Sequence, residues 1–532
     1  MFLGLQEHKV SFDFEMGCVR QRGGIEMSFM EKLEQMLKNK TELTENGAIG
    51  YKTSGKELVD LNFAVSSLRS KEEECIEKSF IKAFYEDQML AWKWLFFLRD
   101  VRGGLGERRT FRVILRFMAY HQPETVKKLV DVIAEYGRLD DLLCLFGTPL
   151  EEEVLTYLGE QLKEDVLRMR DGRTISLCGK WMPSNNASSE RTKKKAQRIQ
   201  NYLGMTSKQY RKMLVELRAY LSVLEVKASA NAWEQVDYEK VPSRANLLYR
   251  NAFLRHDEKR RLEYLGKVER KEAKIQAGVL MPHEIVNAYT ERNGWRVELK
   301  EKDIALEEMW KNLDDTIKGA EDVLCIVDGS GSMMCPVGGA GSSITAHQVS
   351  NALGIYFSER MKGAYKNKFI TFSQSPKYVD FSRCNSLRAK LVLAYAHNDW
   401  TNTNLEATFD LVLHTATENN LKQEELPKTL LVISDMEFDA AVNVSKTAPL
   451  LEGIKEKFKR AGYQMPKLVF WNCNSRTNVI PVRENEMGVG LVSGFSVNVC
   501  NMVLSNQLDP YQCLKEQLNQ PRYQVIEERV AG

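Results

Sequence analysis

The chain has 532 residues, of which 43% are hydrophobic, and its 75 basic and 72 acidic residues leave a formal net charge of +3. This length is far above the size of one hydrophobic core, so we expect two or three domains. The balance of charges gives no global case for nucleic acid or a membrane as a partner. The ten cysteines are scattered without a CxxC pair, which argues against a zinc site or a disulfide framework and for reduced thiols.

The first residues carry no targeting signal. Residues 1–24 have neither the basic start nor the apolar core of a signal peptide, and no apolar run approaches the roughly 20 residues of a membrane span. We therefore expect a cytoplasmic protein with no membrane partner. Residues 1–26 are mixed in composition and are predicted to be an N-terminal extension, before an amphipathic segment at residues 29–37.

The next part of the chain has a helical pattern almost throughout, from residue 58 to about residue 310. It begins with an aromatic-rich helix over residues 80–99, and Gly-rich or Pro-containing breaks separate the helices that follow at residues 110–120, 126–136 and 152–168. An array of antiparallel helices, of which a solenoid is one form, accounts for this pattern better than a sheet. We interpret the aromatic residues as helix-packing core.

Two polar turns interrupt this helical pattern. Residues 100–109 join two predicted helices through three glycines, and residues 136–141 do so through one. We expect a structural ion pair across these turns, between Arg102 and either Asp140 or Asp141.

A local excess of positive charge lies in residues 191–214, which contain no acidic residue. Two interpretations remain open, a solvated helix face and a face that binds the phosphates of RNA. The candidate nucleic-acid-binding residues are Arg191, Lys193, Lys194, Lys195, Arg198, Lys208, Arg211 and Lys212.

After residue 319 the pattern changes to short apolar runs that alternate with helical segments. The predicted strands cover residues 323–327, 369–372, 429–434 and 468–471, and the predicted helices cover residues 344–361, 387–396, 405–415 and 450–461. This alternation is typical of a doubly wound α/β domain, whose ligands lie beyond the carboxyl ends of the strands. We expect an all-α region at residues 27–315 and an α/β domain with a C-terminal segment at residues 316–532.

Oxygen-bearing side chains follow two of these strands. Asp328, Ser330 and Ser332 come directly after the first strand, Asp435 follows a second buried strand, and Thr403 lies in a polar loop just before a helix. Mg²⁺ prefers about six oxygen ligands and keeps several waters, so few charged protein ligands are needed. An ion held by two carboxylates and three hydroxyls would retain positive charge and would attract an acidic group of a partner.

The order Asp328-x-Ser330-x-Ser332, then Thr403, then Asp435 resembles the metal-ion-dependent adhesion site (MIDAS) of von Willebrand factor A domains. The resemblance implies that these five residues bind Mg²⁺ or Mn²⁺. The loop reads Thr401-Asn402-Thr403 where the family often has Gly-Gly-Thr, and Thr403 is the better candidate because the next two residues open the helix.

Other stretches resemble a family that joins a helical region to a von Willebrand A domain and, more distantly, the Ro autoantigen (TROVE) proteins. In TROVE proteins a HEAT-like helical ring binds RNA and the adhesion-type domain closes the ring, so the resemblance implies a HEAT-like repeat region before the α/β domain. The stretches are Arg102-Gly-Gly-Leu-Gly-Glu-Arg, Tyr136-Gly-Arg-Leu-Asp-Asp, Gly179-Lys-Trp-Met-Pro, Tyr210-Arg, Lys240-Val-Pro-Ser and Ser434-Asp-Met-Glu-Phe-Asp.

Three functions compete. The protein is either a non-enzymatic binding scaffold that grips an acidic protein partner through its metal, or a TROVE-like RNA-binding ring protein that acts in RNA or ribonucleoprotein handling, or an enzyme. We expect no enzyme, because Ser330 stands where an aspartyl phosphotransferase needs a second Asp, neither serine has the Gly-x-Ser-x-Gly context of a nucleophile elbow, and the motif stretches contain no histidine. A plain structural role for the Asp and Ser cluster, as a cap of the following segment, is the alternative to all three.

Overall fold

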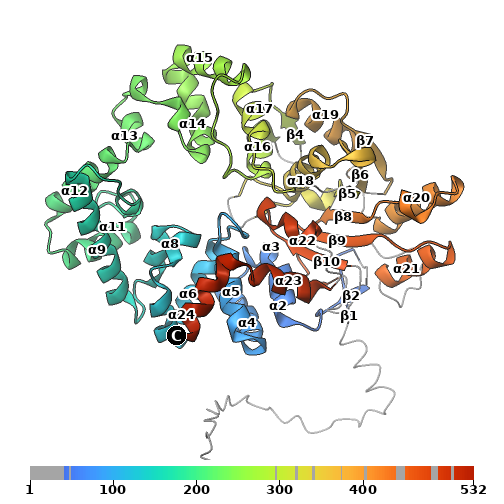
Figure 1. Cartoon of the computed structure of the whole chain (residues 1–532), viewed down its shortest axis with the longest axis horizontal. Helices are drawn as coiled ribbons and strands as arrows, with labels where there is room; N and C mark the ends of the chain where they lie inside the picture. Colours follow the sequence, from blue (N-terminus) through green and yellow to red (C-terminus); the bar gives the residue numbers. More distant parts are fainter. Residues whose placement is uncertain are drawn as a thin grey trace, which may run out of the picture.

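The computed structural model describes residues 41–46, 49–293, 296–317, 322–337, 342–372, 374–398, 400, 404–438, 450–477, 479–480, 489–504 and 509–532. Its first part is helical, and its second part is a six-stranded, mostly parallel sheet with helices (Figure 1). This confirms the predicted fold class. The predicted extension at residues 1–26 and the segment at residues 29–37 lie outside the described residues.

The helical region is built from α-helices of four to twenty residues. Its α-helices are α2 (Glu57–Phe63), α3 (Val65–Leu68), α4 (Glu73–Glu86), α5 (Gln88–Arg99), α6 (Arg109–His121), α7 (Pro123–Leu129), α8 (Ile133–Tyr136), α9 (Glu151–Arg170), α10 (Cys178–Trp181), α11 (Glu190–Tyr202), α12 (Ser207–Tyr220), α13 (Leu224–Ser229), α14 (Ser243–His256), α15 (Glu258–Glu269), α16 (Pro282–Tyr289) and α17 (Ile304–Lys311). Short 3₁₀ helices join them: η1 (Leu139–Leu145), η2 (Trp233–Gln235) and η3 (Tyr238–Lys240).

The aromatic-rich segment near residue 90 packs among the first helices of this region and the C-terminal helices. The single helix predicted there is two helices, because Asp87 ends α4 and its side chain accepts a hydrogen bond from the Leu90 amide at the start of α5. Helix α5 is buried on all sides from Leu90 to Arg99, and Trp92 and Trp94 are each at most 2% exposed. Such a helix must be surrounded by others, which confirms the aromatic residues as packing core.

The sequence pattern does not predict two small β-hairpins in this region. Strand β1 (Thr41–Leu43) pairs with β2 (Ile49–Tyr51), and β3 (Thr290–Asn293) pairs with β4 (Arg296–Leu299). Their three or four residues are too few to show an alternating pattern in the sequence.

The sheet has the strand order β10-β9-β8-β5-β6-β7, and all neighbours are parallel except β6 and β7. Its strands are β5 (Val323–Asp328), β6 (Lys368–Phe372), β7 (Lys377–Asp380), β8 (Thr429–Ser434), β9 (Lys467–Asn472) and β10 (Val489–Ser493). The pairing of β5 with β8, with Val323 opposite Thr429, confirms that the two apolar runs before the predicted metal ligands are parallel neighbours.

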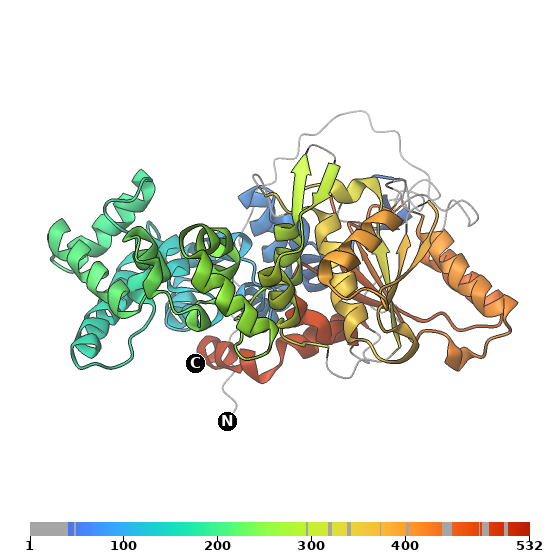
Figure 2. The same ribbon diagram turned by 90° about the horizontal axis from the view of Figure 1, so that it is seen from above.

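Helices cover both faces of the sheet (Figure 2). Helix α18 begins after Thr345, whose hydroxyl caps the Gln348 amide, and it packs against β5, β6 and β8. The helices of this part are α18 (Ala346–Arg360), α19 (Leu387–His397), α20 (Leu405–Glu418), α21 (Leu450–Arg460), α22 (Cys500–Leu504), α23 (Pro510–Leu518) and α24 (Gln524–Ala531).

The end of the chain returns to the beginning of the helical region. Helices α23 and α24 pack against α5, α24 also contacts α7, and β10 contacts α2. The elements therefore follow one another around a ring, from α2 through α9, α14 and α16 to the sheet and back (Figure 1). None of the helices in the described ranges is long and apolar enough to cross a membrane.

Candidate metal centre

The two carboxylates predicted as metal ligands lie together at one edge of the sheet. Asp328 ends β5, and Asp435 follows the last residue of β8. Because β5 and β8 are adjacent parallel strands, their carboxyl ends meet at the same edge. Both side chains are fully buried.

Three hydroxyl groups join these carboxylates in one network. The Ser434 hydroxyl donates to Asp328 Oδ2 over 2.6 Å, and the Ser330 amide donates to Asp328 Oδ1 over 2.9 Å. The hydroxyl oxygens of Ser330 and Ser332 are 3.0 Å apart, and the Ser332 hydroxyl hydrogen-bonds Asp435. Sequence reasoning missed Ser434, although a polar residue at the end of an apolar strand is a usable signal.

Burial and mutual repulsion disfavour the charged forms of this pair. Burial raises the pKa of Asp328, and the negative charge of Asp435 raises it further. Burial also raises the pKa of Asp435, against the opposing effect of the Arg476 guanidinium. Without a cation the two carboxylates are therefore poorly compensated, because a buried charge needs a close partner.

Arg476 is the cationic side chain that the fold places beside the pair. Its Nη1 atom lies 3.3 Å from Asp435 Oδ2 and donates to the Cys335 sulfur, also over 3.3 Å. Its Nη2 atom forms an ion pair with Glu45, which comes from the turn after β1. Sequence reasoning missed Arg476 and Glu45, because nothing local marks residues that meet across most of the chain.

Glu437 anchors the segments that carry these two residues. Its carboxylate accepts hydrogen bonds from the backbone amides of Glu45 (2.8 Å), Arg476 (2.7 Å) and Thr477 (3.0 Å). The Thr477 hydroxyl lies 3.0 and 3.1 Å from its two oxygens. Glu437 is fully buried, so it is a structural clamp beside the candidate centre.

The loop after β5 is packed too tightly for side chains at its glycines. A Cβ atom at Gly329 would lie 2.3 Å from the Asn398 side-chain oxygen. The Asn398 amide nitrogen lies 2.6 Å from His347 Nε2, and the His347 ring contacts Trp400. This contact holds Trp400 in place, and Thr403 itself lies outside the described residues. Burial lowers the pKa of His347 to about 3, so its ring is neutral.

The donor set fits a hard divalent cation. Asp435 Oδ2 is buried and makes no hydrogen bond with any described residue, and every ligand candidate offers oxygen, which Mg²⁺ and Mn²⁺ prefer. Across the described residues no group of three or more His, Cys, Asp or Glu side chains is placed to hold a metal. Hydroxyl groups and water would therefore have to complete the coordination of an ion at Asp328 and Asp435.

The candidate RNA-binding residues of the basic run fall into two groups, one paired with other residues and one exposed. The run occupies α11 and α12, where Lys193, Arg198 and Lys212 form ion pairs with Glu190, Glu151 and Glu216, respectively. Lys195 is half-buried and donates to the Leu143 carbonyl over 2.7 Å, and burial lowers its pKa. The exposed side chains of Arg191, Lys194, Lys208 and Arg211 make no hydrogen bond or ion pair with any described residue.

The ion pair predicted for Arg102 is wrong. Asp141 is fully buried and is paired with Arg99 (2.8 Å) and Arg112 (2.6 Å), and Asp140 is paired with Arg138. The Arg102 guanidinium instead donates to the Glu135 carbonyl over 3.4 Å. Arg99 on α5, Arg112 on α6 and Arg138 within the turn already pair with these two carboxylates, so the Arg102 side chain of the glycine-rich loop does not.

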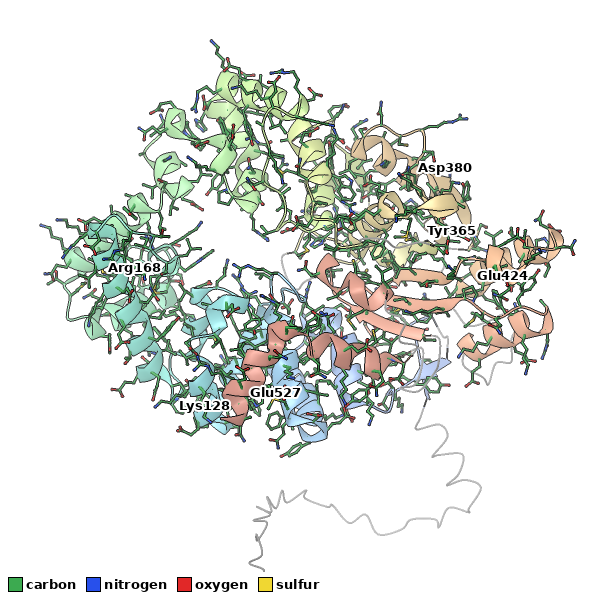
Figure 3. All side chains as sticks on the ribbon, viewed as in Figure 1. Lys128, Arg168, Tyr365, Asp380, Glu424 and Glu527 are labelled. Atoms are coloured by element: carbon green, nitrogen blue, oxygen red, sulfur yellow. The ribbon has the colours of Figure 1, made fainter. Side chains whose placement is uncertain are left out.

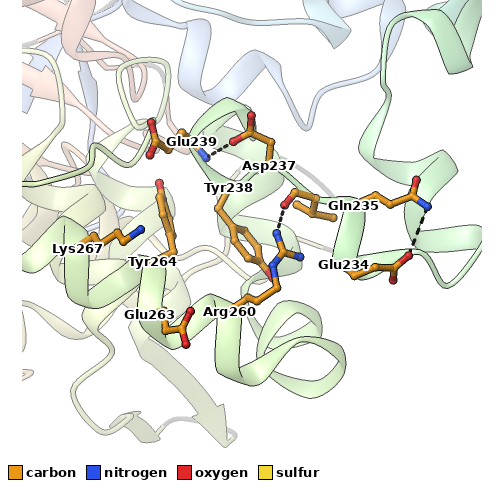
Figure 4. Close-up of a pocket in the computed structure, with 10 residues that line it drawn as sticks. Glu234, Gln235, Asp237, Tyr238, Glu239, Arg260, Glu263, Tyr264 and Lys267 are labelled. Atoms are coloured by element: carbon orange, nitrogen blue, oxygen red, sulfur yellow. Dashed lines mark hydrogen bonds between the residues drawn. The ribbon is translucent and has the colours of Figure 1, made fainter.

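A separate pocket of about 400 Å³ lies in the helical region, between α15 and the segment around η2 and η3 (Figure 4). The rings of Tyr238 and Tyr264 stack at 5.4 Å on its wall, and Arg260 pairs with Asp257 beside it. Its other lining side chains are mostly acidic and exposed. None of the predicted site residues lines this pocket.

Comparison with known proteins places the chain in a family. Residues 149–322 match a domain of unknown function (DUF2828), and residues 322–528 match a second one (DUF7788). The chain is 30% identical over 505 residues to an uncharacterized protein of Acanthamoeba polyphaga mimivirus, an alignment that covers 87% of this chain and 84% of the viral protein. The chain therefore belongs to the same family as this viral protein, and in it a DUF2828 region is followed by a DUF7788 region.

Proposed function

We propose that the protein is a non-enzymatic binding scaffold. Its α/β part acts as a von Willebrand A-like domain that binds Mg²⁺ or Mn²⁺ through Asp328, Ser330, Ser332, Thr403 and Asp435. The bound metal supplies an open coordination position with net positive charge, and an acidic group of a protein partner fills that position.

One observation carries this proposal: two fully buried carboxylates share a network of hydroxyls at the ends of adjacent parallel strands. Two like charges at such a site are costly unless a cation lies between or beside them. Of the two site carboxylates Arg476 is paired with that of Asp435, so Asp328 has no cationic partner among the described residues. A divalent ion would satisfy both carboxylates.

A binding role also agrees with the surroundings of the centre. His347 lies behind the metal-binding loop, where burial holds it neutral with a pKa of about 3. It therefore cannot act as a proton donor near neutral pH. Ser330 is 1% exposed, and its hydroxyl lies 3.0 Å from that of Ser332 and has no hydrogen bond with a histidine of the described residues. These residues therefore support ligand binding better than nucleophilic catalysis.

Calorimetric titration with Mg²⁺ and Mn²⁺ tests the metal site. The unmodified protein should bind one ion, and the isosteric changes Asp328→Asn and Asp435→Asn should each abolish the binding heat. Asp410→Asn is the matched control, because it removes the same charge from α20, where Asp410 pairs with Lys457 on the surface. Metal binding by Asp328→Asn equal to that of the unmodified protein would show that the site is misplaced.

The alternative function, a TROVE-like RNA-binding ring protein, is supported by two features. The α/β part and the C-terminal helices close the helical region into a ring (Figure 1), as the resemblance to TROVE proteins implies. Four basic side chains on α11 and α12 are exposed and have no ion-pair partner among the described residues: Arg191, Lys194, Lys208 and Arg211. Both features agree with a polyanionic partner.

A further inference from the structure

Arg476 connects the candidate metal centre with the protein surface. One terminal nitrogen of its guanidinium faces the buried Asp435 carboxylate at 3.3 Å, and the other contacts the Glu45 carboxylate. The Asp435 side chain is 0% exposed, whereas the Glu45 side chain is 56% exposed. The Arg476 guanidinium therefore bridges two carboxylates. The inner one, of Asp435, is buried, and the outer one, of Glu45, is reached by solvent.

Glu45, the outer carboxylate, lies in a strap, defined here as residues 44–46. The Thr44 hydroxyl donates to the Phe438 carbonyl, the Glu45 amide donates to the Glu437 carboxylate over 2.8 Å, and the Asn46 side chain donates to the Glu437 carbonyl over 2.7 Å. These contacts use the backbone of Glu45, and among the described residues its side chain pairs with Arg476. The strap can therefore stay in place when the Glu45 carboxylate moves.

The ion pair between Glu45 and Arg476 is of a kind that exchanges readily. An ion pair with one exposed partner contributes little net stability, because water and salt compete for both charges. A guanidinium also donates hydrogen bonds to any carboxylate through the same planar fork of N–H groups. A carboxylate from another molecule could thus take the place of Glu45 without breaking the backbone contacts of the strap.

We propose that Glu45 is an internal stand-in for the acidic group of the partner, and that Arg476 is the specificity-determining residue that exchanges one for the other. This inference rests on the proposed function, because the partner's carboxylate is the group that the metal also attracts. In the free protein Glu45 holds Arg476. In the complex the incoming carboxylate lies between the metal and Arg476, and Glu45 turns to solvent.

The test uses the full chain loaded with Mn²⁺ and a short alanine-rich peptide that contains one glutamate. The relaxation rate of water protons reports the number of waters on the bound Mn²⁺, so it falls when the peptide carboxylate reaches the metal. Glu45→Gln should bind the peptide about 1.4- to fivefold more tightly than the unmodified protein, because an exposed ion pair is worth about 0.2 to 1 kcal/mol. The matched control Glu42→Gln removes an exposed charge from β1 of the same hairpin and should change nothing.

Arg476→Gln should weaken peptide binding while it leaves Mn²⁺ binding intact or tighter, because a positive charge beside Asp435 is lost. Arg476→Lys should recover part of the peptide affinity, which separates the role of the charge from damage to the fold. Unchanged peptide affinity in Glu45→Gln, with Mn²⁺ bound, would overturn this inference alone. Failure of the unmodified protein to bind Mn²⁺ would overturn the proposed function and this inference with it.

Discussion

His283 on α16 is a buried histidine at the meeting point of the helical region and the sheet. Its side chain is 6% exposed, and its ring contacts Phe495, over which the Arg69 guanidinium lies at 4.0 Å. Burial, helped by the positive charges of Arg69 and Arg244, lowers the pKa of His283 to about 3. The folded protein therefore holds this ring neutral.

The stability of the protein should depend on pH through His283. The unfolded chain takes up a proton near pH 6.5 and the folded chain does not, so the stabilising contribution is complete above that pH and is lost as the pH falls. Between pH 7.5 and 5.5 the loss is about 1.3 kcal/mol for one histidine. Urea unfolding at both pH values should show His283→Gln losing that much less stability than the unmodified protein, and equal losses would contradict the buried neutral ring.

The site carboxylates should give a pH effect of opposite sign. Burial raises the pKa of both Asp328 and Asp435, so the metal-free protein loses stability as the pH rises above their ordinary range near 4. A divalent cation favours the charged forms and removes this loss. We expect Mg²⁺ to raise the melting temperature more at pH 8 than at pH 5.5. Asp328→Asn should abolish the difference, and a shift that is the same at both pH values would argue against this pair as the ligands.

At the scale of elements, the C-terminal segment locks the sheet to the helical region. Asp100, at the end of α5, is fully buried and accepts hydrogen bonds from Arg522 Nη2 (2.7 Å) and the Tyr523 hydroxyl (3.0 Å). The Arg522 carbonyl in turn accepts from the Tyr136 hydroxyl over 2.6 Å. Lys93, also on α5, pairs with Glu527 on α24.

Removal of Arg522 should be strongly destabilising, because it leaves the Asp100 charge buried and without its cation. We expect Arg522→Ala to lower the free energy of unfolding by about 3 kcal/mol or more. Arg529→Ala is the matched control. Arg529 pairs with Asp131 between the same parts of the chain, but both side chains are about half exposed, so its loss should cost under about 1 kcal/mol. Chemical denaturation compares them, and equal effects would show that Asp100 tolerates the loss of its partner.

The strands that the sequence predicts have a stronger apolar pattern than the strands that it does not predict. Strands β5 and β8 are continuous apolar runs bounded by carboxylates, so their pairing and the placement of Asp328 and Asp435 were predictable. Strand β7 is a half-exposed edge strand, and β10 contains Gly490, so neither shows a strong pattern. Residues such as Glu45 join the site through contacts that span almost 400 residues, and no local signal encodes them.

The ring is a property of the whole molecule that local patterns could not establish. Helix periodicity predicts the succession of helices, but closure depends on α23 and α24 returning to α5 and on β10 reaching α2. Figure 3 places Lys128 and Glu527 near one another at the lower rim, although one belongs to α7 and the other to α24. The C-terminal helices are thus tied to the early helices α2, α5 and α7, and both proposed binding sites lie on one connected frame.

RNA binding, the alternative function, can be tested by its salt dependence. Each phosphate neutralised by a basic side chain contributes a log-log slope of about 0.7 for single strands. We expect a variant in which Arg191, Lys194, Lys208 and Arg211 are all changed to Gln to bind a single-stranded RNA more weakly, with a slope lower by up to about 2.8 for four such contacts. Fluorescence anisotropy over a range of salt concentrations gives both quantities.

A second variant tests whether RNA binding depends on which basic side chains are changed or only on how much positive charge is removed. Lys193, Lys195, Arg198 and Lys212 are already engaged by acidic side chains or by a carbonyl, so changing these four to Gln removes the same formal charge but should alter the slope much less. Asp328→Asn should leave RNA binding unchanged, because the metal centre lies on the sheet edge. Loss of RNA binding in Asp328→Asn, with no effect of the basic residues, would mean that the metal itself holds the nucleic acid. No binding even at low salt would leave the protein-binding scaffold as the function, because the exposed basic residues would then have no polyanion to neutralise.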